Sequence, residues 1–322
     1  RQWRMKTLRN TKEIKMTGKD LKVKSEMRKE NVYNEEASQN TANRAIYNKN
    51  KEETPLVSVI MPAYRCARTI SQAIDSVLIQ NVPLELIVIN DCSPDALDAV
   101  MERYAMDSRV RYVKNEKNCG AAVSRNRGVS MAAGKYIAFL DADDWWDPDK
   151  LEKQLVQMEK TKAVLCCTAR ELVTPDGIQS GRVIGVKEKI TYRMLLHQNW
   201  INCSSVLLKA EVAKAFPMEH EEGHEDYILW LRILKKYGWA VAVNEPLLKY
   251  RLSTDGKSGN KLHSAKMTYD SYRYAGLGRT KAMLCFCAYT VNGIKKYTFA
   301  YLRTFLLQGR KRCDRISKNS TK

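Results

Sequence analysis

Long apolar segments are missing from this sequence. No run approaches the roughly 20 apolar residues that a membrane-spanning helix requires, and the charged first residues are not followed by the apolar stretch of a signal peptide. The sequence therefore predicts a cytoplasmic protein without a membrane span. Because 44% of the 322 residues are hydrophobic, the chain can still bury the core of one large domain.

Paired cysteine motifs and clustered histidines are missing as well. The nine cysteines show no CxxC spacing and are odd in number. A chain of this length does not need disulfides for stability, so a reducing cytosol is the favoured compartment. His224 and Glu225 are adjacent, but no second histidine lies at the spacing that a zinc site requires. The sequence thus predicts neither a disulfide scaffold nor a zinc centre.

Glycine-rich phosphate loops are absent too. The first predicted strand is followed by residues 62–67, which contain no glycine, and no GxxxxGK[ST] sequence occurs anywhere. A nicotinamide dehydrogenase needs the former and a P-loop nucleotidase needs the latter, because these glycines let the backbone approach the phosphates closely. The sequence therefore excludes both enzyme classes.

The net charge of +19 is concentrated at the two ends of the sequence. Residues 1–54 contain 14 Lys and Arg against 8 Asp and Glu, and residues 278–322 contain 11 against 1, which leaves only +3 for the residues between them. A nucleic-acid binder would carry its basic surface on the folded body, so we expect no nucleic-acid partner. Basic ends are instead typical of peripheral contact with an anionic membrane.

Strand-like and helix-like segments alternate from Pro55 onward, which is typical of an α/β fold. Short apolar runs predict strands over residues 56–61, 86–89, 110–113, 136–140, 163–173, 204–208, 239–243 and 247–251. Helical spacing predicts helices over residues 70–78, 94–104, 120–133, 147–160 and 226–236, with Gly134 as a C-terminal cap and Asp147 as an N-terminal cap. We expect three parts: a disordered or loosely helical basic extension (1–54), an α/β domain (55–255) and a basic helical tail (256–322).

Three of the predicted strands end near residues that can bind ligands. Tyr64 follows the first strand, Asp91 the second and Asp141 the fourth. Ligands of open α/β sheets bind beyond the carboxyl ends of the strands, so we expect these side chains around one crevice. Locally, two interpretations stay open: Asp91 could bind a nucleotide base or cap the helix that starts at Pro94, and Tyr64 could stack on a base or fill a turn.

The acidic sequence Asp141-Ala142-Asp143-Asp144 is the sharpest local feature. Residues two apart on an extended chain point to the same side, so Asp141 and Asp143 can converge. Carboxylates held this close repel one another unless a cation offsets them, and hard oxygen ligands suit Mg²⁺ or Mn²⁺. Taken alone, the cluster is equally compatible with an acidic turn in which Asp143 or Asp144 caps a helix.

Two further charged residues lie near predicted helix starts. Arg125 is one turn into the helix that begins near Gly120, where it would help attract a diphosphate, although a single Arg is usually solvated. Asp226 begins an amphipathic helix. It could take a proton from an acceptor hydroxyl, or it could simply be a favourable acidic residue at a helix start.

Taken together and in this order, these segments resemble the family 2 glycosyltransferases. The resemblance covers about residues 55–255 and is carried by Ser58–Tyr64, Ala73–Leu78, Asn90–Ser93, Ala122–Gly128, Tyr136–Asp144, Glu225–Tyr227 and Leu231–Arg232. Residues 260–296 are similar to a narrower group, the bacterial teichuronic-acid-type polysaccharide glycosyltransferases. The resemblance implies the GT-A fold, which has a Rossmann-like, mainly parallel sheet flanked by helices, here with a C-terminal helical extension.

The resemblance also implies an activity. It is the inverting transfer of a sugar from a nucleotide-sugar donor, with UDP as the expected nucleotide, to a hydroxyl of a growing cell-surface polysaccharide or lipid-linked glycan. This reaction would take place at the inner face of the cell membrane. Asp226 would be the catalytic base, and Arg251 would lie near the diphosphate of the donor.

The remaining roles concern the donor and the metal. The resemblance implies that Tyr64 and Asp91 hold the nucleotide base and that Arg125 lies near the ribose or phosphates. Asp141 and Asp143 would form the DxD motif, which uses Mn²⁺ or Mg²⁺. Within it, Asp143 would contact the metal and Asp141 the ribose or the metal.

Two positions depart from the pattern of the family. Asn90 stands where a second acid usually precedes Asp91, which could alter the nucleotide preference, and Arg65 stands where Asn usually follows the Tyr. The main alternative function is a non-catalytic nucleotide-sugar or glycan-binding module of the same fold. Such a module would be expected to lose an acidic site residue, and here all of them are in place.

The basic tail predicts an amphipathic helix. One face carries the stripe Ile294, Tyr297, Thr298, Tyr301, Leu302, Phe305 and Leu306, and another face carries Lys296, Arg303 and Arg310. This pattern is typical of a helix that lies in a membrane interface. It is equally compatible with a helix that packs on the catalytic domain.

Overall fold

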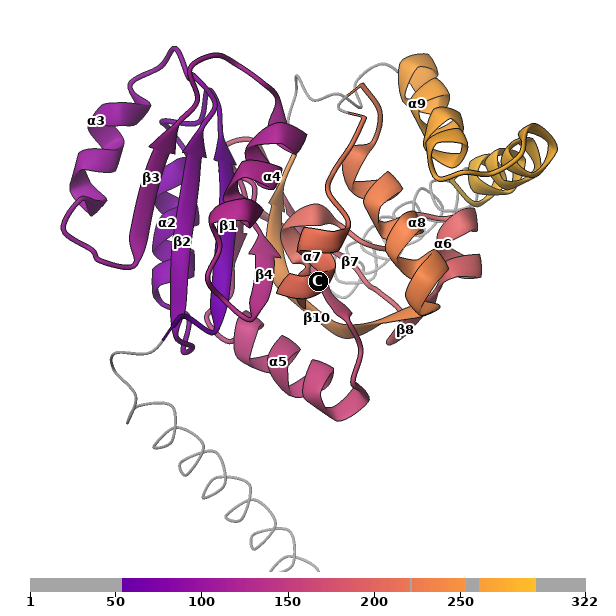
Figure 1. Ribbon diagram of the computed structural model, residues 1–322, viewed down its shortest axis with the longest axis horizontal. Helices are drawn as coiled ribbons and strands as arrows, with labels where there is room; N and C mark the ends of the chain where they lie inside the picture. Colours follow the sequence, from indigo (N-terminus) through magenta and orange to yellow (C-terminus); the bar gives the residue numbers. More distant parts are fainter. Residues whose placement is uncertain (1–53, 221, 253–260, 294–322) are drawn as a thin grey trace, which may run out of the picture. The chain divides into compact units, whose positions relative to one another are not determined.

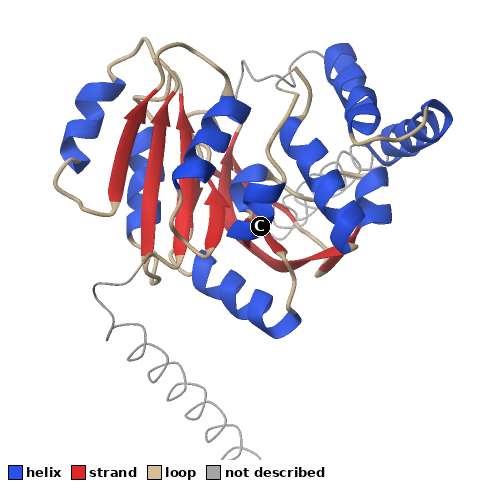
Figure 2. Cartoon of the chain, viewed as in Figure 1, coloured by secondary structure: helices blue, strands red, loops and turns tan. Residues whose placement is uncertain are grey.

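The structure, a computed structural model, describes residues 54–220, 222–252 and 261–293. These residues form a ten-stranded sheet in the order β3-β2-β1-β4-β9-β6-β10-β5, with β7 beside β6 and β8 beside β10. Helices pack on the sheet (Figure 1), and helices and strands alternate along much of the chain (Figure 2). The predicted α/β class is confirmed.

The elements of the sheet and its helices have the following bounds. The strands are β1 (Val57–Ala63), β2 (Leu84–Asn90), β3 (Val110–Lys114), β4 (Tyr136–Phe139), β5 (Trp145–Trp146), β6 (Leu165–Val173), β7 (Gln179–Ile184), β8 (Lys189–Thr191), β9 (Leu207–Lys209) and β10 (Trp239–Arg251). The α-helices are α2 (Ile70–Leu78), α3 (Leu97–Met101), α4 (Ala121–Met131), α5 (Lys150–Thr161), α6 (Tyr192–His197), α7 (Ala210–Ala215), α8 (Glu225–Tyr237) and α9 (Lys261–Tyr274). A further helix covers residues 279–293.

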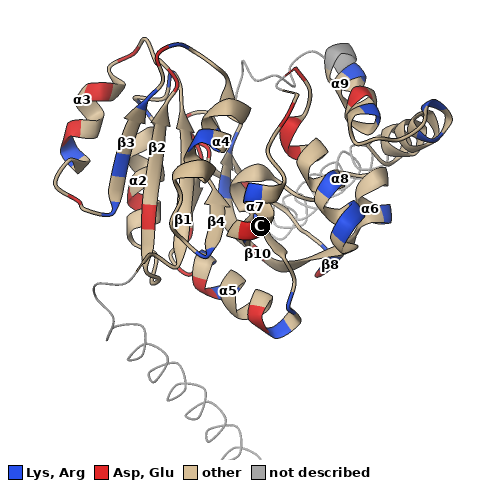
Figure 3. Ribbon diagram, viewed as in Figure 1, with Lys and Arg blue, Asp and Glu red and all other residues tan. Residues whose placement is uncertain are grey.

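Strands β1 to β4 form the parallel half of the sheet. β1 pairs in parallel with both β2 and β4, and β2 pairs in parallel with β3. Alternate residues of β1 enter two different cores: Val59 packs with α2, whereas Ile60 packs with α4 on the opposite face. Both faces are covered, so β1 and β4 are uncharged along their length (Figure 3) and read as continuous apolar runs.

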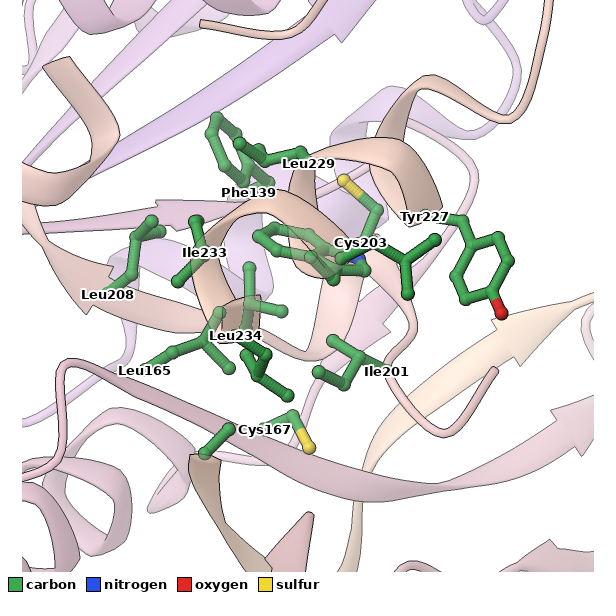
Figure 4. Close-up of a cluster of buried hydrophobic side chains, with 14 of the residues drawn as sticks. Phe139, Leu165, Cys167, Ile201, Cys203, Leu208, Tyr227, Leu229, Ile233 and Leu234 are labelled. Atoms are coloured by element: carbon green, nitrogen blue, oxygen red, sulfur yellow. The ribbon is translucent and has the colours of Figure 1, made fainter. Parts of the chain in front are cut away.

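The other half of the sheet is mixed. β9 is antiparallel to β4 and β6, whereas β10 is parallel to β6. Helix α8 packs on this half through Leu229, Ile233 and Leu234, in one cluster with Phe139, Leu165 and Leu208 (Figure 4). Each buried Leu or Ile contributes roughly 1.5–3 kcal/mol. This packing fixes α8, whose first turn carries Asp226.

Two helices begin later than predicted. α3 starts at Leu97 rather than at Pro94, and its end tightens into a 3₁₀ turn over residues 102–104. α5 starts at Lys150, because Asp147 has another partner: its carboxylate lies 3.0 Å from Lys249 Nζ on β10. The predicted N-cap role of Asp147 is therefore wrong.

Gly134 is not the C-terminal cap that the sequence predicts. α4 already ends at Met131, and Ala132 after it is extended. The backbone N–H of Gly134 instead donates to Ser58 Oγ, 2.8 Å away. A Cβ at this position would come within 2.6 Å of the Ser58 backbone nitrogen. Gly134 is thus required for the close approach of this loop to β1.

Several strand boundaries also differ from the predictions. Residues 239–243 and 247–251 belong to one strand, β10, which bulges between Val243 and Leu248. Residues 203–205 form a 3₁₀ turn, so the strand predicted over 204–208 is shifted to β9. The short elements β7, β8, α6 and α7 had no predicted counterpart.

The described part of the tail packs on the domain. α9 and the helix that follows it contribute Tyr272, Leu277 and Ala282 to the core cluster that contains α8. The Tyr272 hydroxyl donates to the Leu196 carbonyl of α6 at 2.7 Å. These helices therefore extend the core beyond residue 255.

Some predictions fall outside the described residues, namely those for residues 1–53 and for the amphipathic stripe over residues 294–310. Within the described ranges, no helix combines the length and the apolar character that crossing a membrane requires. The described cysteines are all free thiols, as the absence of paired motifs predicts.

Candidate active site

The carboxyl ends of β1, β2 and β4 lie side by side, because these strands are parallel neighbours. Tyr64 directly follows β1, Asp91 directly follows β2, and Asp141 lies two residues beyond β4. The structure thus brings these three predicted residues to one edge of the sheet. That edge is where open α/β sheets bind their ligands.

Arg125 joins two acidic segments that are far apart in the sequence. Its guanidinium lies 2.6 Å from Asp141 Oδ1 and 3.1 Å from Glu225 Oε1. One cation therefore links the acidic turn after β4 to the start of α8. Only 6% of the Arg125 side chain is exposed, so the alternative of a solvated arginine is wrong.

Asp226 lies partly buried beside this ion-pair network. Burial and the neighbouring Glu225 carboxylate raise the pKa of Asp226 to about 7, while Arg125 acts in the opposite direction. Asp226 Oδ1 accepts a hydrogen bond from the backbone N–H of Tyr227 at 2.7 Å. A carboxyl group whose pKa is near neutrality has the proton affinity of a general base.

The acidic turn after β4 is held in place by hydrogen bonds. The backbone N–H of Asp141 donates to Ser204 Oγ, and that of Asp144 donates to the Asp141 carbonyl. The short strand β5 follows this turn, so Asp143 and Asp144 do not cap a helix. Asp144 is only 1% exposed. Its Oδ1 accepts from the backbone N–H of Arg251, and its Oδ2 has no hydrogen bond within the described residues.

The donor set of this turn fits a divalent cation. Burial, followed by the charge of Asp141, raises the pKa of Asp143 to about 6, and burial together with both neighbours raises the pKa of Asp144 well above its usual range. A bound cation would offset this repulsion. No group of three or more His, Cys, Asp or Glu side chains is arranged for a metal in the described ranges. Mg²⁺ and Mn²⁺ sites commonly combine one or two carboxylates with substrate phosphates, so the turn meets that requirement.

Asp91 holds the loop before α4 instead of capping the helix considered in the sequence. Its carboxylate accepts from the backbone N–H groups of Cys119 (2.9 Å) and Gly120 (2.8 Å) and from Asn115 Nδ2 (2.7 Å). Asp91 therefore anchors the loop that leads into α4, and it does not cap the helix after Pro94. It is 3% exposed, and its carboxylate keeps one lone-pair site for a further donor.

Tyr64 is 42% exposed, at the carboxyl end of β1. The guanidinium carbon of Arg65 lies 5.2 Å from the centroid of the Tyr64 ring. The backbone N–H of Arg65 donates to Ser93 Oγ at 2.7 Å, which ties the loop after β1 to the loop after β2. Arg65 has φ = 52°, a left-handed conformation in which Asn is enriched and other side chains are disfavoured. This strain is a physical reason for the Asn that is usual at this position.

Asn90 is buried, and its side chain is engaged in hydrogen bonds with neighbouring residues of β3 and α3. Its Nδ2 donates to Asp98 Oδ1 and to the Tyr112 hydroxyl, and its Oδ1 accepts from the backbone N–H of Ser93. An acid here would lose both donors and would face the Asp98 carboxylate. The amide is therefore matched to its neighbours in this chain.

Arg251 lies under the acidic turn. Its Nε donates to the Asp143 carbonyl at 2.9 Å, and its two terminal nitrogens donate to the Pro175 carbonyl and to Gln72 Oε1. The guanidinium carbon is 5.1 Å from the centroid of the Trp145 ring. Arg251 thus braces the turn through neutral acceptors.

Sequence reasoning missed two residues at this site, Arg170 of β6 and Tyr250 of β10. The guanidinium carbon of Arg170 lies 5.7 Å from the centroid of the Tyr250 ring, and the charges of Asp144 and Asp226 both act on Arg170. A charged residue inside the apolar stretch 163–173 was the available signal. The pairing of Arg125 with Glu225 was also missed, because no local pattern reveals a contact across 100 positions.

Solved structures support the fold. The chain is similar to Staphylococcus aureus TarS in complex with UDP-GlcNAc, with a TM-score of 0.57 and 16% identity over 73% of this chain and 71% of that chain. It is also similar to a mannosyltransferase of Pyrobaculum calidifontis in complex with GDP-Man and Mn²⁺, with a TM-score of 0.56 and 17% identity over 74% and 69% of the two chains. The predicted GT-A architecture is thereby confirmed.

Sequence relatives define the family. The chain is 38% identical to a Bacillus subtilis protein named as the teichuronic acid biosynthesis glycosyltransferase TuaG, over 75% of this chain and 97% of that protein. It is 37% identical to the Escherichia coli UDP-Glc:alpha-D-GlcNAc-diphosphoundecaprenol beta-1,3-glucosyltransferase WfgD, over 76% and 96% of the two chains. Residues 58–209 match the family described as Glycosyl transferase family 2. This chain therefore belongs to the family 2 glycosyltransferases.

Proposed function

We propose that this glycosyltransferase is inverting and metal-dependent, and that it moves one sugar from a nucleotide-sugar donor to a hydroxyl of a growing glycan. The observation that carries the proposal is the position of Asp226, whose carboxyl group has a pKa of about 7. Its neighbour Glu225 forms an ion pair with Arg125, and Arg125 also pairs with Asp141 of the acidic turn. A single displacement needs one base here and a cationic centre for the leaving group nearby.

Asp226 would act as the catalytic base. Its carboxylate would accept the proton of the acceptor hydroxyl while the hydroxyl oxygen attacks the anomeric carbon of the donor sugar. The bond between that carbon and the diphosphate oxygen breaks in the same step, so the configuration inverts. A carboxylate with a raised pKa is a stronger base than a solvated one, yet it is still partly ionised at neutral pH.

Asp143 and Asp141 are the residues that would hold Mn²⁺ or Mg²⁺. When bound, such an ion would stabilise the charge that develops on the leaving diphosphate. Asp141 already pairs with Arg125 at 2.6 Å. We therefore assign the metal contact first to Asp143 and give Asp141 to the ribose or the metal. The Mn²⁺ in the Pyrobaculum calidifontis complex supports the use of a divalent metal.

Four residues are proposed to bind the rest of the donor. Tyr64, exposed at the carboxyl end of β1, would stack on the nucleotide base, and Asp91 would accept a hydrogen bond from it. Arg125 would lie near the ribose or phosphates, and Arg251 near the diphosphate. UDP is the proposed nucleotide, supported by the UDP-GlcNAc in the TarS complex and by the UDP-Glc in the name of WfgD.

The acceptor is proposed to be a lipid-linked glycan or a cell-surface polysaccharide. The name of WfgD specifies a GlcNAc-diphosphoundecaprenol acceptor, and that of TuaG specifies teichuronic acid biosynthesis. An acceptor of this kind would place the enzyme at the inner face of the cell membrane, where the basic tail would contact anionic lipid. Co-sedimentation of the full chain with anionic vesicles tests this contact, and a protein that stays in the supernatant contradicts it.

The catalytic proposal is tested by following donor hydrolysis across a panel of nucleotide-sugars with Mn²⁺, with Mg²⁺ and with EDTA. We expect release from one donor that requires the metal. Asp226→Asn should reduce this turnover by about 10²- to 10⁴-fold, while calorimetric titration shows donor binding nearly unchanged. The control Asp149→Asn alters an exposed carboxylate at the start of α5 and should be neutral.

Other outcomes distinguish the alternatives. Equal loss of binding and turnover in Asp226→Asn contradicts its role as a base. Metal-dependent UDP binding by the wild type without turnover, even with a lipid-linked acceptor present, favours a non-catalytic binding module. The absence of any nucleotide binding contradicts the whole proposal.

A further inference from the structure

Three guanidinium groups lie near the acidic turn and the start of α8, and two of them already pair with neighbouring residues, although Arg125 Nε is also a buried donor without an acceptor. Arg125 forms two ion pairs, and Arg251 donates three side-chain hydrogen bonds. The side chain of Arg170 forms no ion pair or hydrogen bond with any described residue, and its Nε is a buried donor without an acceptor. Its one recorded side-chain contact is with the ring of Tyr250. Of these three cations, Arg170 is therefore the one whose guanidinium remains available to a ligand.

The sheet fixes where Arg170 lies. On β6 it is opposite Leu248 of β10 and Ile184 of β7. It is partly exposed, so a ligand can reach it. The carboxylates of Asp144 and Asp226 both act on its charge. The ring that Arg170 contacts belongs to Tyr250, which directly precedes Arg251, and the backbone N–H of Arg251 donates to Asp144 Oδ1. Arg170 therefore lies near the acidic turn.

The charge of Arg170 is not stabilised by the protein alone. Burial lowers the pKa of its guanidinium despite the nearby carboxylates, the direction expected when desolvation outweighs pairing. A buried cation with unused donors destabilises the folded state. Such a group is typical of a site that an anionic ligand completes.

We infer that Arg170 is a donor-binding residue whose guanidinium receives two anionic oxygens of the nucleotide-sugar. The planar fork of an arginine matches a phosphate or a carboxylate in a bidentate manner. The transferred sugar must lie between the leaving diphosphate and the base, so the anionic group is either a donor phosphate next to the sugar or a carboxylate on the sugar itself. This inference rests on the proposed function.

The test measures binding and stability in the full chain. Wild type, Arg170→Met, Arg170→Lys and the control Arg111→Met are titrated calorimetrically, with Mn²⁺, against UDP, UDP-glucose and UDP-glucuronic acid. Arg111 lies on β3, at the far side of the sheet. Arg170→Met should weaken binding by about 10- to 100-fold, as expected for the loss of a charge-assisted contact. Arg170→Lys should lie in between, because it keeps the charge and loses the fork.

The pattern across the probes identifies the group. Equal weakening for all three probes assigns Arg170 to a donor phosphate, and weakening confined to UDP-glucuronic acid assigns it to a sugar carboxylate. In both cases the melting temperature of ligand-free Arg170→Met should equal or exceed that of the wild type. A lower melting temperature with unchanged affinities would show a purely structural cation and overturn the inference alone. Failure of the wild type to bind any probe would overturn the proposed function as well.

Discussion

The two halves of the sheet differ in how completely their buried polar side chains are hydrogen-bonded. In the parallel half, no buried side-chain nitrogen or oxygen of residues 57–115 lacks a hydrogen bond, although Arg125 Nε on α4 does. In the mixed half, Thr168, Arg170 and Trp230 each have such an unpaired atom. Buried polar groups normally find partners, and exceptions call for an explanation. Arg170 contacts the ring of Tyr250 and is acted on by the charge of Asp226, so we infer that part of the polar surface of the mixed half binds substrate.

This difference predicts opposite responses to mutation. Removing a polar group from the parallel half should destabilise the protein, because its partners are left unsatisfied. Removing an unpaired polar group from the mixed half should leave the stability unchanged or increase it. Proteins commonly give up stability at functional sites in this way.

Arg125→Met should have the largest effect, because Arg125 holds the two halves together. The substitution leaves Asp141 and Glu225 as uncompensated acids, and we expect the free energy of unfolding to fall by about 3–5 kcal/mol. Urea denaturation measures this loss. A loss below 1 kcal/mol would mean that the halves are held together without the ion pairs.

The same variant should change the pH dependence of activity. Burial and Glu225 raise the pKa of Asp226 to about 7 even though Arg125 lowers it. Without Arg125 this pKa rises, so the base becomes ionised only at higher pH. The acidic limb of the plot of kcat/KM against pH should therefore move to higher pH. A limb that does not move would mean that ionisation of Asp226 does not cause this pH dependence.

Ser58→Ala tests the parallel half. Ser58 is fully buried on β1; its Oγ donates to Glu85 Oε1 at 2.6 Å and accepts from the backbone N–H of Gly134. Losing both bonds should reduce the free energy of unfolding by about 1–3 kcal/mol. The control Ser130→Ala, an exposed serine on α4, should change it by less than about 0.5 kcal/mol. Equal effects of the two substitutions would contradict the contrast between the halves.

The parallel half was the more predictable from sequence. Its strands are buried on both faces, so the runs around Val59 and Leu86 are continuous and apolar, and its ligand-binding residues directly follow strand ends. Because Tyr64, Asp91 and Asp141 each follow a predicted strand, their position at one edge of the sheet could be predicted. Only the helix starts and the role of Gly134 were wrong, because they depend on contacts with distant residues.

The mixed half was less predictable for the same reason. β7 is exposed and β8 and α6 are short, so they lack a clear periodic pattern. The bulge in β10 depends on its pairing with β6. The site itself combines Arg170, Tyr250 and Asp226 from three segments, and only Asp226 was found, through the resemblance to a family. Spatial contacts of this kind leave no local signal in one sequence.

Thr168→Val tests the mixed half. Thr168 is 2% exposed, and its Oγ1 has no hydrogen-bond partner in the described residues. Valine has the same shape without the hydroxyl, so we expect an increase in the free energy of unfolding of about 1 kcal/mol. Thr268→Val is the matched control, because Thr268 is also buried but its hydroxyl donates to the Ser264 carbonyl; it should destabilise. If both variants destabilise the protein, the hydroxyl of Thr168 contributes to stability and the contrast between the halves is contradicted.

Arg65→Asn should have the smallest effect, and it separates backbone strain from ligand binding in the loop after β1. Asn tolerates the positive φ of Arg65 better than Arg does, so the free energy of unfolding should rise by about 0.5–1 kcal/mol. Arg68→Asn, a nearby exposed arginine without this backbone conformation, is the control and should show no gain. Because Arg65 also contacts the ring of Tyr64, UDP binding should be measured in both variants. A gain in stability with unchanged UDP affinity would show that Arg65 strains the loop and does not bind the nucleotide. Weaker UDP binding would show that its guanidinium contacts the nucleotide.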